Sequence, residues 1–176
     1  MKGFLVAQFI GFIALGLFIL VFQVNKRPAM LKLSMWAAFT YAIHYFLLGA
    51  YTGSALSLVT AIRNYAYSKY GTAKYRSLLP VVFTIIFIAV GIVTWQGPLS
   101  FLPLCTSVAG AIAYWQSPRV IRVVELLSTP LLLLYNVASH SYPGILIEIL
   151  FFASTLIGVY RFDLRQAHQK QTALAR

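Results

Sequence analysis

Almost every lysine and arginine of this chain falls in alternate gaps between long apolar stretches. The chain of 176 residues has 14 Lys and Arg, yet only 10% of its residues are charged and 60% are hydrophobic. A soluble protein has about a quarter of its residues charged, and a small domain cannot hide so much apolar surface in one core. In polytopic membrane proteins the cytoplasmic loops collect Lys and Arg. The alternation therefore predicts an integral membrane protein with several spans.

Seven apolar stretches approach the length of a transmembrane helix, which needs about 20 mainly apolar residues and tolerates roughly 17 to 25. They are Phe4 to Val24, Ser34 to Tyr51, Ser54 to Lys69, Leu79 to Gln96, Leu99 to Gln116, Val120 to His140 and Ile145 to Tyr160. None of the gaps is long enough for a soluble domain. The sequence thus predicts an all-α integral membrane protein, with seven transmembrane helices in a single membrane domain over residues 1–176.

The basic residues test this count, because each span takes the chain to the other side of the membrane. Twelve of them fall on one side: Lys26, Arg27, Lys32, Lys69, Lys74, Arg76, Arg119, Arg122, Arg161, Arg165, Lys170 and Arg176. The other side receives only Lys2. We therefore expect a multi-pass protein with its N-terminus outside and its C-terminus in the cytoplasm. Arg63 is the exception, since it lies within the third span.

The first three spans also match the last three. Phe22-Gln23 aligns with Trp115-Gln116 at an offset of 93 residues, and Tyr51-Thr52-Gly53 aligns with Tyr142-Pro143-Gly144 at an offset of 91. Two three-helix units in the same orientation need one connecting span. The predicted units are a first triple-helix repeat over 4–70, a linker helix over 79–96, a second repeat over 99–161 and a cytoplasmic basic tail over 162–176.

Three segments carry a resemblance to a known family. They are Gln8-Phe9-Ile10-Gly11-Phe12-Ile13-Ala14, then Ala42-Ile43-His44-Tyr45-Phe46-Leu47-Leu48-Gly49-Ala50-Tyr51-Thr52-Gly53, then Ala61-Ile62-Arg63-Asn64. In these segments the chain resembles the YgjV-type bacterial inner-membrane proteins, a family without a characterised function. The resemblance implies a location in the bacterial inner membrane.

More distantly, the 3+1+3 arrangement is similar to the SWEET and PQ-loop superfamily and to the PnuC-type vitamin transporters. Those proteins move small solutes through a pocket between two triple-helix bundles. The resemblance implies that Gln23 and Gln116 take the position of the PQ-loop glutamine and that Asn64 is a polar pocket residue. The chain departs from the pattern, because no proline precedes Gln23 and Thr155 stands where the second repeat would have an asparagine. Sugar specificity is therefore not implied.

Three charged side chains lie three or more residues inside the predicted spans, where charge is costly and marks a candidate for function. Counting along the helices, Arg63 lies about 9 Å and Glu125 about 7 Å from the cytoplasmic ends of their spans. One hypothesis is an ion pair between them that acts as a gate between the two bundles. In the alternative, Arg63 extends to the lipid headgroups and Glu125 pairs with Arg122 at i, i+3.

The third charge, Glu148, is expected about 5 Å below the outer surface. One hypothesis places Glu148 and His140 together in an outer vestibule that attracts a cationic solute. The alternative is a solvated carboxylate beside an interfacial histidine.

Polar and aromatic residues gather on the second and third spans of each repeat. His44 is expected about 15 Å along its span, near the midplane, where it would hydrogen-bond a solute or carry a proton. The candidate substrate-binding residues are His44, Tyr45, Asn64, Tyr135 and Asn136. The alternatives are an interhelical hydrogen bond for the histidine and plain helix packing for the aromatic residues.

The leading functional hypothesis is a membrane transporter or facilitator that moves a small polar solute by alternating access. Its rival is a non-transporting inner-membrane component, either a structural partner or a sensor of a ligand or lipid, with a core sealed by aromatic packing. No motif for a metal, a cofactor, nucleic acid or paired-carboxylate catalysis is visible, so we do not expect an enzyme. The expected partners are membrane lipids and the solute, and a homo-oligomer is compatible with the sequence.

Overall fold

The fold consists of seven α-helices and one short 3-10 helix, with no β-strand in the part of the chain that the structure describes. The structure is a computed structural model that describes residues 2–21, 27–70, 78–113 and 118–160. Its elements are α1 (Lys2–Val21), α2 (Arg27–Leu47), α3 (Tyr51–Tyr70), α4 (Leu78–Val93), η1 (Pro98–Ser100), α5 (Phe101–Ala113), α6 (Pro118–Ala138) and α7 (Tyr142–Gly158). The predicted all-helical class is confirmed.

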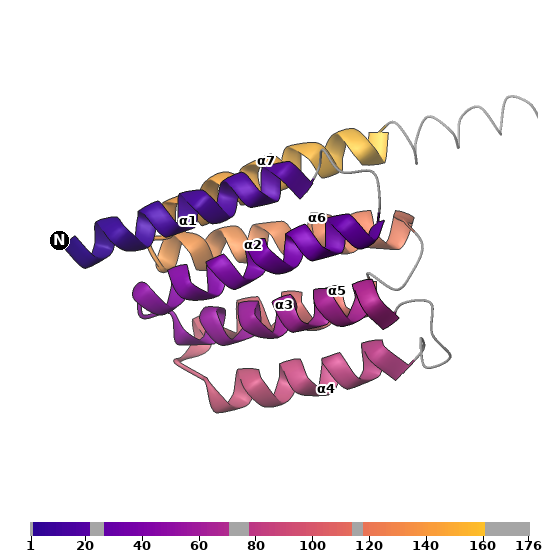
Figure 1. Ribbon diagram of the computed structural model, residues 1–176, viewed down its shortest axis with the longest axis horizontal. Helices are drawn as coiled ribbons and strands as arrows, with labels where there is room; N and C mark the ends of the chain where they lie inside the picture. Colours follow the sequence, from indigo (N-terminus) through magenta and orange to yellow (C-terminus); the bar gives the residue numbers. More distant parts are fainter. Residues whose placement is uncertain (1, 22–26, 71–77, 114–117, 161–176) are drawn as a thin grey trace, which may run out of the picture.

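The seven helices lie side by side, and consecutive helices run in opposite directions (Figure 1). α2 packs against α1 and α3, while α6 packs against α5 and α7. The two groups meet where α1 contacts α7 and where α3 contacts α5, and α4 packs against both α3 and α5 at one edge. The bundle is therefore two layers, α1–α2–α3 and α5–α6–α7, with α4 beside them.

Three short connections lie together at the end of the bundle that also holds the start of α1 (Figure 1). They are residues 48–50, 94–97 and 139–141, and this end is called the tight-turn end below. The far ends of the helices form the opposite end of the bundle.

The turn after α2 and the turn after α6 have the same hydrogen bonds. Ala50 N donates to Tyr45 O at 2.9 Å, and Ser141 N donates to Asn136 O at 2.9 Å. In each turn the preceding residue is left-handed, with φ 75° at Gly49 and 53° at His140. This is the Schellman ending of a helix, which satisfies the last carbonyl groups. The donors and acceptors of the two turns are related by the same offset of 91 residues that relates the sequence segments.

The helix ends differ from the predicted spans because hydropathy does not detect caps. α2 begins at Arg27 rather than Ser34, with Pro28 in its first turn, where the missing N–H of proline is not needed. α2 also ends at Leu47 instead of Tyr51, since the turn at Gly49 stops it. α7 begins at Tyr142, three residues before the predicted start, because Ser141 caps it by accepting a hydrogen bond from Gly144 N.

The bundle is apolar outside and polar in parts of its interior. Phe9 is 68% exposed and Val93 is 85% exposed, whereas His44, Thr52 and Ser141 are fully buried. Water does not favour such an outer surface, but the hydrocarbon of a bilayer does. Among the described helices one stretch, Gly3–Val21, is both long enough and apolar enough by composition to cross a membrane, and Leu78–Val93, Pro98–Ala113 and Tyr142–Ile157 are apolar but shorter.

Candidate functional site

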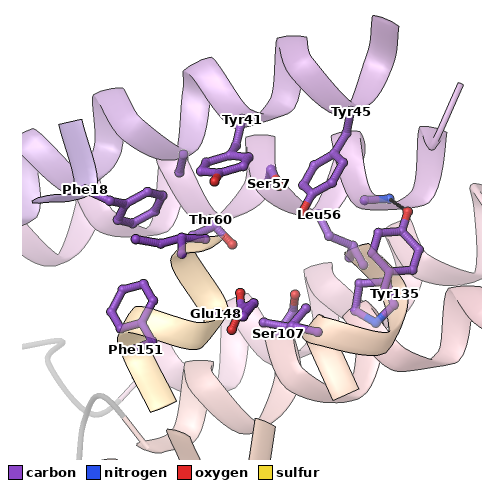
Figure 2. Close-up of a pocket in the computed structure, with 15 residues that line it drawn as sticks. Phe18, Tyr41, Tyr45, Leu56, Ser57, Thr60, Ser107, Tyr135, Glu148 and Phe151 are labelled. Atoms are coloured by element: carbon purple, nitrogen blue, oxygen red, sulfur yellow. Dashed lines mark hydrogen bonds between the residues drawn. The ribbon is translucent and has the colours of Figure 1, made fainter. Parts of the chain in front are cut away.

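Two adjoining chambers lie between the two layers. The first has a volume of about 170 Å³ and is called the tyrosine chamber, because Tyr41, Tyr45 and Tyr135 line it (Figure 2). The second has a volume of about 210 Å³ and is called the arginine chamber, because Arg63 lines it. The residues that line both chambers are Phe18, Thr60, Ser107, Leu132, Glu148 and Phe151. The chambers thus meet at Glu148, between helices of both layers.

Five aromatic rings form a continuous arc along the tyrosine chamber. Successive ring centroids are 6.0 Å apart from Phe151 to Phe18, 5.5 Å from Phe18 to Tyr41, 5.7 Å from Tyr41 to Tyr45 and 5.9 Å from Tyr45 to Tyr135. The arc crosses both layers, since its residues belong to α7, α1, α2 and α6. Figure 2 shows the rings bordering the space into which the carboxylate of Glu148 points.

Two of the three tyrosine hydroxyls are used to hold the layers together. Tyr45 Oη donates to Asn136 Oδ1 at 2.6 Å, and Tyr135 Oη accepts from Gly53 N at 3.0 Å. Tyr41 is 5% exposed, and its hydroxyl has no hydrogen-bond partner among the described residues. Of the predicted substrate-binding residues, Tyr45 and Tyr135 therefore line the chamber, but their hydroxyls are already bonded.

Glu148 is 8% exposed and lies six residues after the start of α7. Among the described residues its carboxylate has no hydrogen-bond or ion-pair partner. The expectation of a shallow, solvated carboxylate is wrong, because the early start of α7 places Glu148 about 9 Å into the helix. His140, the other residue of the predicted vestibule, is exposed in the turn before α7, so the structure does not bring the two together in one site.

In the arginine chamber, Arg63 is 6% exposed and its guanidinium group is held within the bundle. Its Nε and Nη2 atoms donate to Asn64 Oδ1 at 3.2 and 3.0 Å. Its guanidinium carbon lies 5.9 Å from the ring centroid of Tyr67 and 5.8 Å from that of Phe87. The side chain is thus buried against aromatic rings and does not extend along the outer surface.

Glu125 lines the same chamber as Arg63 and Asn64. Arg63 lies seven residues before the end of α3, and Glu125 lies seven residues after the start of α6. Both are therefore about 10 Å from the opposite end of the bundle. The ion pair between them stays a prediction.

His44 does not line either chamber. It is fully buried, with Nδ1 2.7 Å from Ala7 O and Nε2 2.8 Å from Ser141 Oγ. A carbonyl oxygen only accepts, so Nδ1 donates, and in the neutral ring Nε2 then accepts from the Ser141 hydroxyl. The predicted midplane position is wrong, because the early end of α2 puts His44 in its last turn, at the tight-turn end.

Gly11 allows this arrangement because a Cβ atom there would be 2.7 Å from the ring of His44 and 2.8 Å from Pro143. Beside it, Gln8 Nε2 donates to His140 O at 2.7 Å. Asn136 is also buried, 1% exposed, and bonds to Tyr45 without lining a chamber. These residues form a polar cluster that joins both layers at the tight-turn end; its members are Ala7, Gln8, His44, Tyr45, Asn136, His140 and Ser141.

The repeat glutamines Gln23 and Gln116 and the predicted basic tail over 162–176 lie outside the described residues. The sequence reasoning missed Phe18, Phe151 and the hydroxyl residues of the chambers. A signal for the latter was present, since Ser57, Thr60 and Asn64 follow one face of α3 at helical spacing. All three line the chambers.

Comparison with known proteins agrees with this all-helical, apolar-surfaced architecture. Residues 5–166 match the Imp-YgjV family, described as "Bacterial inner membrane protein". The chain is 27% identical over 165 residues to the "Inner membrane protein YgjV" of Escherichia coli (strain K12). The aligned region covers 92% of this chain and 87% of that protein. No solved structure is significantly similar to this chain. The chain therefore belongs to the Imp-YgjV family of bacterial inner membrane proteins.

Proposed function

We propose that this inner-membrane protein is a transporter or facilitator that carries a small polar solute through the chambers between its two helix layers. The observation that carries the proposal is the pair of adjoining chambers, about 170 and 210 Å³ in volume, which meet at a buried carboxylate. Binding sites for small molecules are concave and mostly apolar, with a few convergent polar groups. A core sealed by packed aromatic rings, which a purely structural membrane component would have, leaves no such space.

Alternating access needs contacts between the layers that close one end while the other opens. At the tight-turn end, Tyr45 and Asn136 bond α2 to α6, and Gly53 and Tyr135 bond α3 to α6. His44 adds a bond from α2 to Ser141, which caps α7. These hydrogen bonds support a state closed at the tight-turn end, and opening there requires that they break.

The same proposal includes the finer topology. All seven helices would cross the bilayer, in a 3+1+3 order with α4 as the linker, and the matching turns after α2 and α6 support this repeat. By the distribution of basic residues, the tight-turn end would face outward and the C-terminus would lie in the cytoplasm.

Arg63 and Glu125 would then close the cytoplasmic side. Their shared chamber and equal depth support an ion pair that forms in one state and breaks in the other. A double-mutant cycle with Arg63→Ala and Glu125→Ala tests it by solute uptake. We expect solute uptake by the double variant to be little lower than uptake by each single variant. If the two losses of uptake simply add, Arg63 and Glu125 do not share a role.

The transport proposal is tested by uptake into proteoliposomes. Purified protein is reconstituted and exposed to a panel of labelled cationic, neutral and anionic small solutes, with protein-free liposomes as the control. We expect saturable uptake of at least one class. Absence of uptake for every class by protein that remains folded would contradict the proposal and favour the non-transporting alternative.

A further inference from the structure

The tyrosine chamber has a charge pattern that selects its ligand. Of the described residues that line it, Glu148 is the one with a formal charge, and none is Lys, Arg or His. Its carboxylate is buried and has no hydrogen-bond or ion-pair partner in the described part of the chain. A buried charge is normally paired, because leaving it alone in apolar surroundings is costly. A cation bound in the tyrosine chamber would provide the partner that the residues lining this chamber do not.

The walls of the chamber suit an organic cation. The arc of Phe151, Phe18, Tyr41, Tyr45 and Tyr135 borders the space in front of the Glu148 carboxylate (Figure 2). Aromatic faces attract ammonium groups, and rings arranged around a site are the usual receptor for quaternary ammonium ligands. A metal ion would favour further carboxylate, histidine or cysteine ligands, and of these groups the described lining residues provide the Glu148 carboxylate alone.

A free hydroxyl points to the same site. Tyr41 Oη is buried without a hydrogen-bond partner among the described residues, although the hydroxyls of Tyr45 and Tyr135 are bonded. The chamber is also lined by the hydroxyl residues Ser57, Thr60 and Ser107. These groups suit a polar substituent on the ligand.

The size of the chamber limits the ligand. Its volume is about 170 Å³, and a cavity of about 150 Å³ in another protein holds one benzene molecule. The space therefore fits an ammonium group with a few carbon substituents.

We propose that the tyrosine chamber binds a small organic cation, with its ammonium group between the Glu148 carboxylate and the aromatic arc. Cation binding specifies the kind of solute for the proposed function, and movement of the cation across the membrane rests on that proposed function. Binding of the cation is measured separately from its transport.

The test is direct binding to the purified full chain in detergent, by titration calorimetry. The probes are methylammonium, tetramethylammonium and choline, with 3,3-dimethyl-1-butanol as the uncharged counterpart of choline. We expect at least one cation to bind, and choline to bind at least about tenfold more tightly than its counterpart. Binding of none of the cations, or equal binding of choline and the alcohol, would overturn the proposal.

Two variants locate the site. Glu148→Gln keeps the shape and removes the charge, so the preference for the cation over the alcohol should disappear. Phe18→Leu removes a ring of the arc and should weaken cation binding several-fold, while the matched change Phe9→Leu on the outer face of α1, where Phe9 is 68% exposed, should leave it unchanged. Retained cation preference in a folded Glu148→Gln variant would refute the assignment.

Proteoliposome flux separates this inference from the transport proposal. Cation binding at Glu148 without flux of any solute would support the inference and contradict transport. Flux of neutral or anionic solutes without cation binding would support transport and overturn the inference.

Discussion

The polar cluster at the tight-turn end and the tyrosine chamber both contain buried polar groups, but the groups differ in what they contact. In the cluster, both ring nitrogens of His44 are hydrogen-bonded and the Tyr45 hydroxyl is bonded to Asn136, while Gln8 Oε1 and Asn136 Nδ2 have no partner among the described residues. In the chamber, the Glu148 carboxylate and the Tyr41 hydroxyl are buried but lack such partners among the described residues. Hydrogen bonds between buried groups of the two layers hold the layers together, whereas the carboxylate and the hydroxyl that line the chamber are groups that a bound ligand can satisfy. The comparison assigns stability to the cluster and binding to the chamber.

The largest effect is expected from His44. The change His44→Asn shortens the side chain, so it cannot reach both Ala7 O and Ser141 Oγ, which leaves buried groups unpaired. We expect the free energy of unfolding in detergent to fall by about 2 to 3 kcal/mol. The matched control is His140→Asn, because His140 is exposed and asparagine tolerates its left-handed backbone. If the two variants have the same free energy of unfolding, the hydrogen bonds of His44 do not stabilise the fold.

A sharper comparison uses two tyrosines one helical turn apart. Tyr45→Phe removes the donor to Asn136 Oδ1, and we expect a loss of about 1 kcal/mol in the free energy of unfolding. Tyr41→Phe removes a hydroxyl without a described partner, so we expect no loss. Denaturant titration of both variants in the same detergent measures the difference. Equal losses would mean that the Tyr41 hydroxyl is bonded as firmly as that of Tyr45.

A substitution at Glu148 is expected to leave stability unchanged or to increase it, unlike the substitution at His44. Because Glu148→Gln removes an unpaired buried charge, we expect the free energy of unfolding to stay the same or rise by up to about 1 kcal/mol. Thermal unfolding in detergent without ligand measures it. A clear loss of stability would show that the carboxylate supports the fold. That result would contradict the contrast between Glu148 and His44.

The smallest effect is expected at the turn after α6. His140 has φ 53°, a conformation that costs a residue with a side chain about 1 kcal/mol more than glycine, and the equivalent residue of the other turn is Gly49. We expect His140→Gly to raise the free energy of unfolding by about 0.5 kcal/mol. The hydrogen bond from Gln8 is kept, because it ends on the backbone carbonyl of residue 140. A destabilised variant would mean that the histidine side chain has a role of its own.

Hydropathy and turn chemistry in the sequence were sufficient to predict the helices. The seven apolar stretches correspond to the seven helices, and the segments around Gly53 and Gly144 correspond to matching helix starts. The ends of α2 and α7 were misplaced by several residues, because a capping serine and a left-handed glycine act locally and leave the average hydropathy unchanged.

These small errors in helix ends produced the larger errors in the site. Moving the end of α2 from Tyr51 to Leu47 takes His44 from the midplane to the last turn, and moving the start of α7 takes Glu148 from the surface into the bundle. Partners also depend on how each helix is rotated about its axis, which spacing along one chain does not give. The sequence could therefore identify Glu148 and Tyr45 as candidates, but it could not tell which of them was already bonded.

Solute uptake with a blocked chamber tests the central claim most directly. Thr60 lines both chambers, so Thr60→Phe fills the space where they meet, while Ile62→Phe adds a ring on the outer face of the same helix, where Ile62 is 55% exposed. In proteoliposomes with a solute that the unmodified protein transports, we predict that Thr60→Phe abolishes uptake and that Ile62→Phe retains it. Uptake at the unmodified rate by folded Thr60→Phe protein would contradict a path through the chambers.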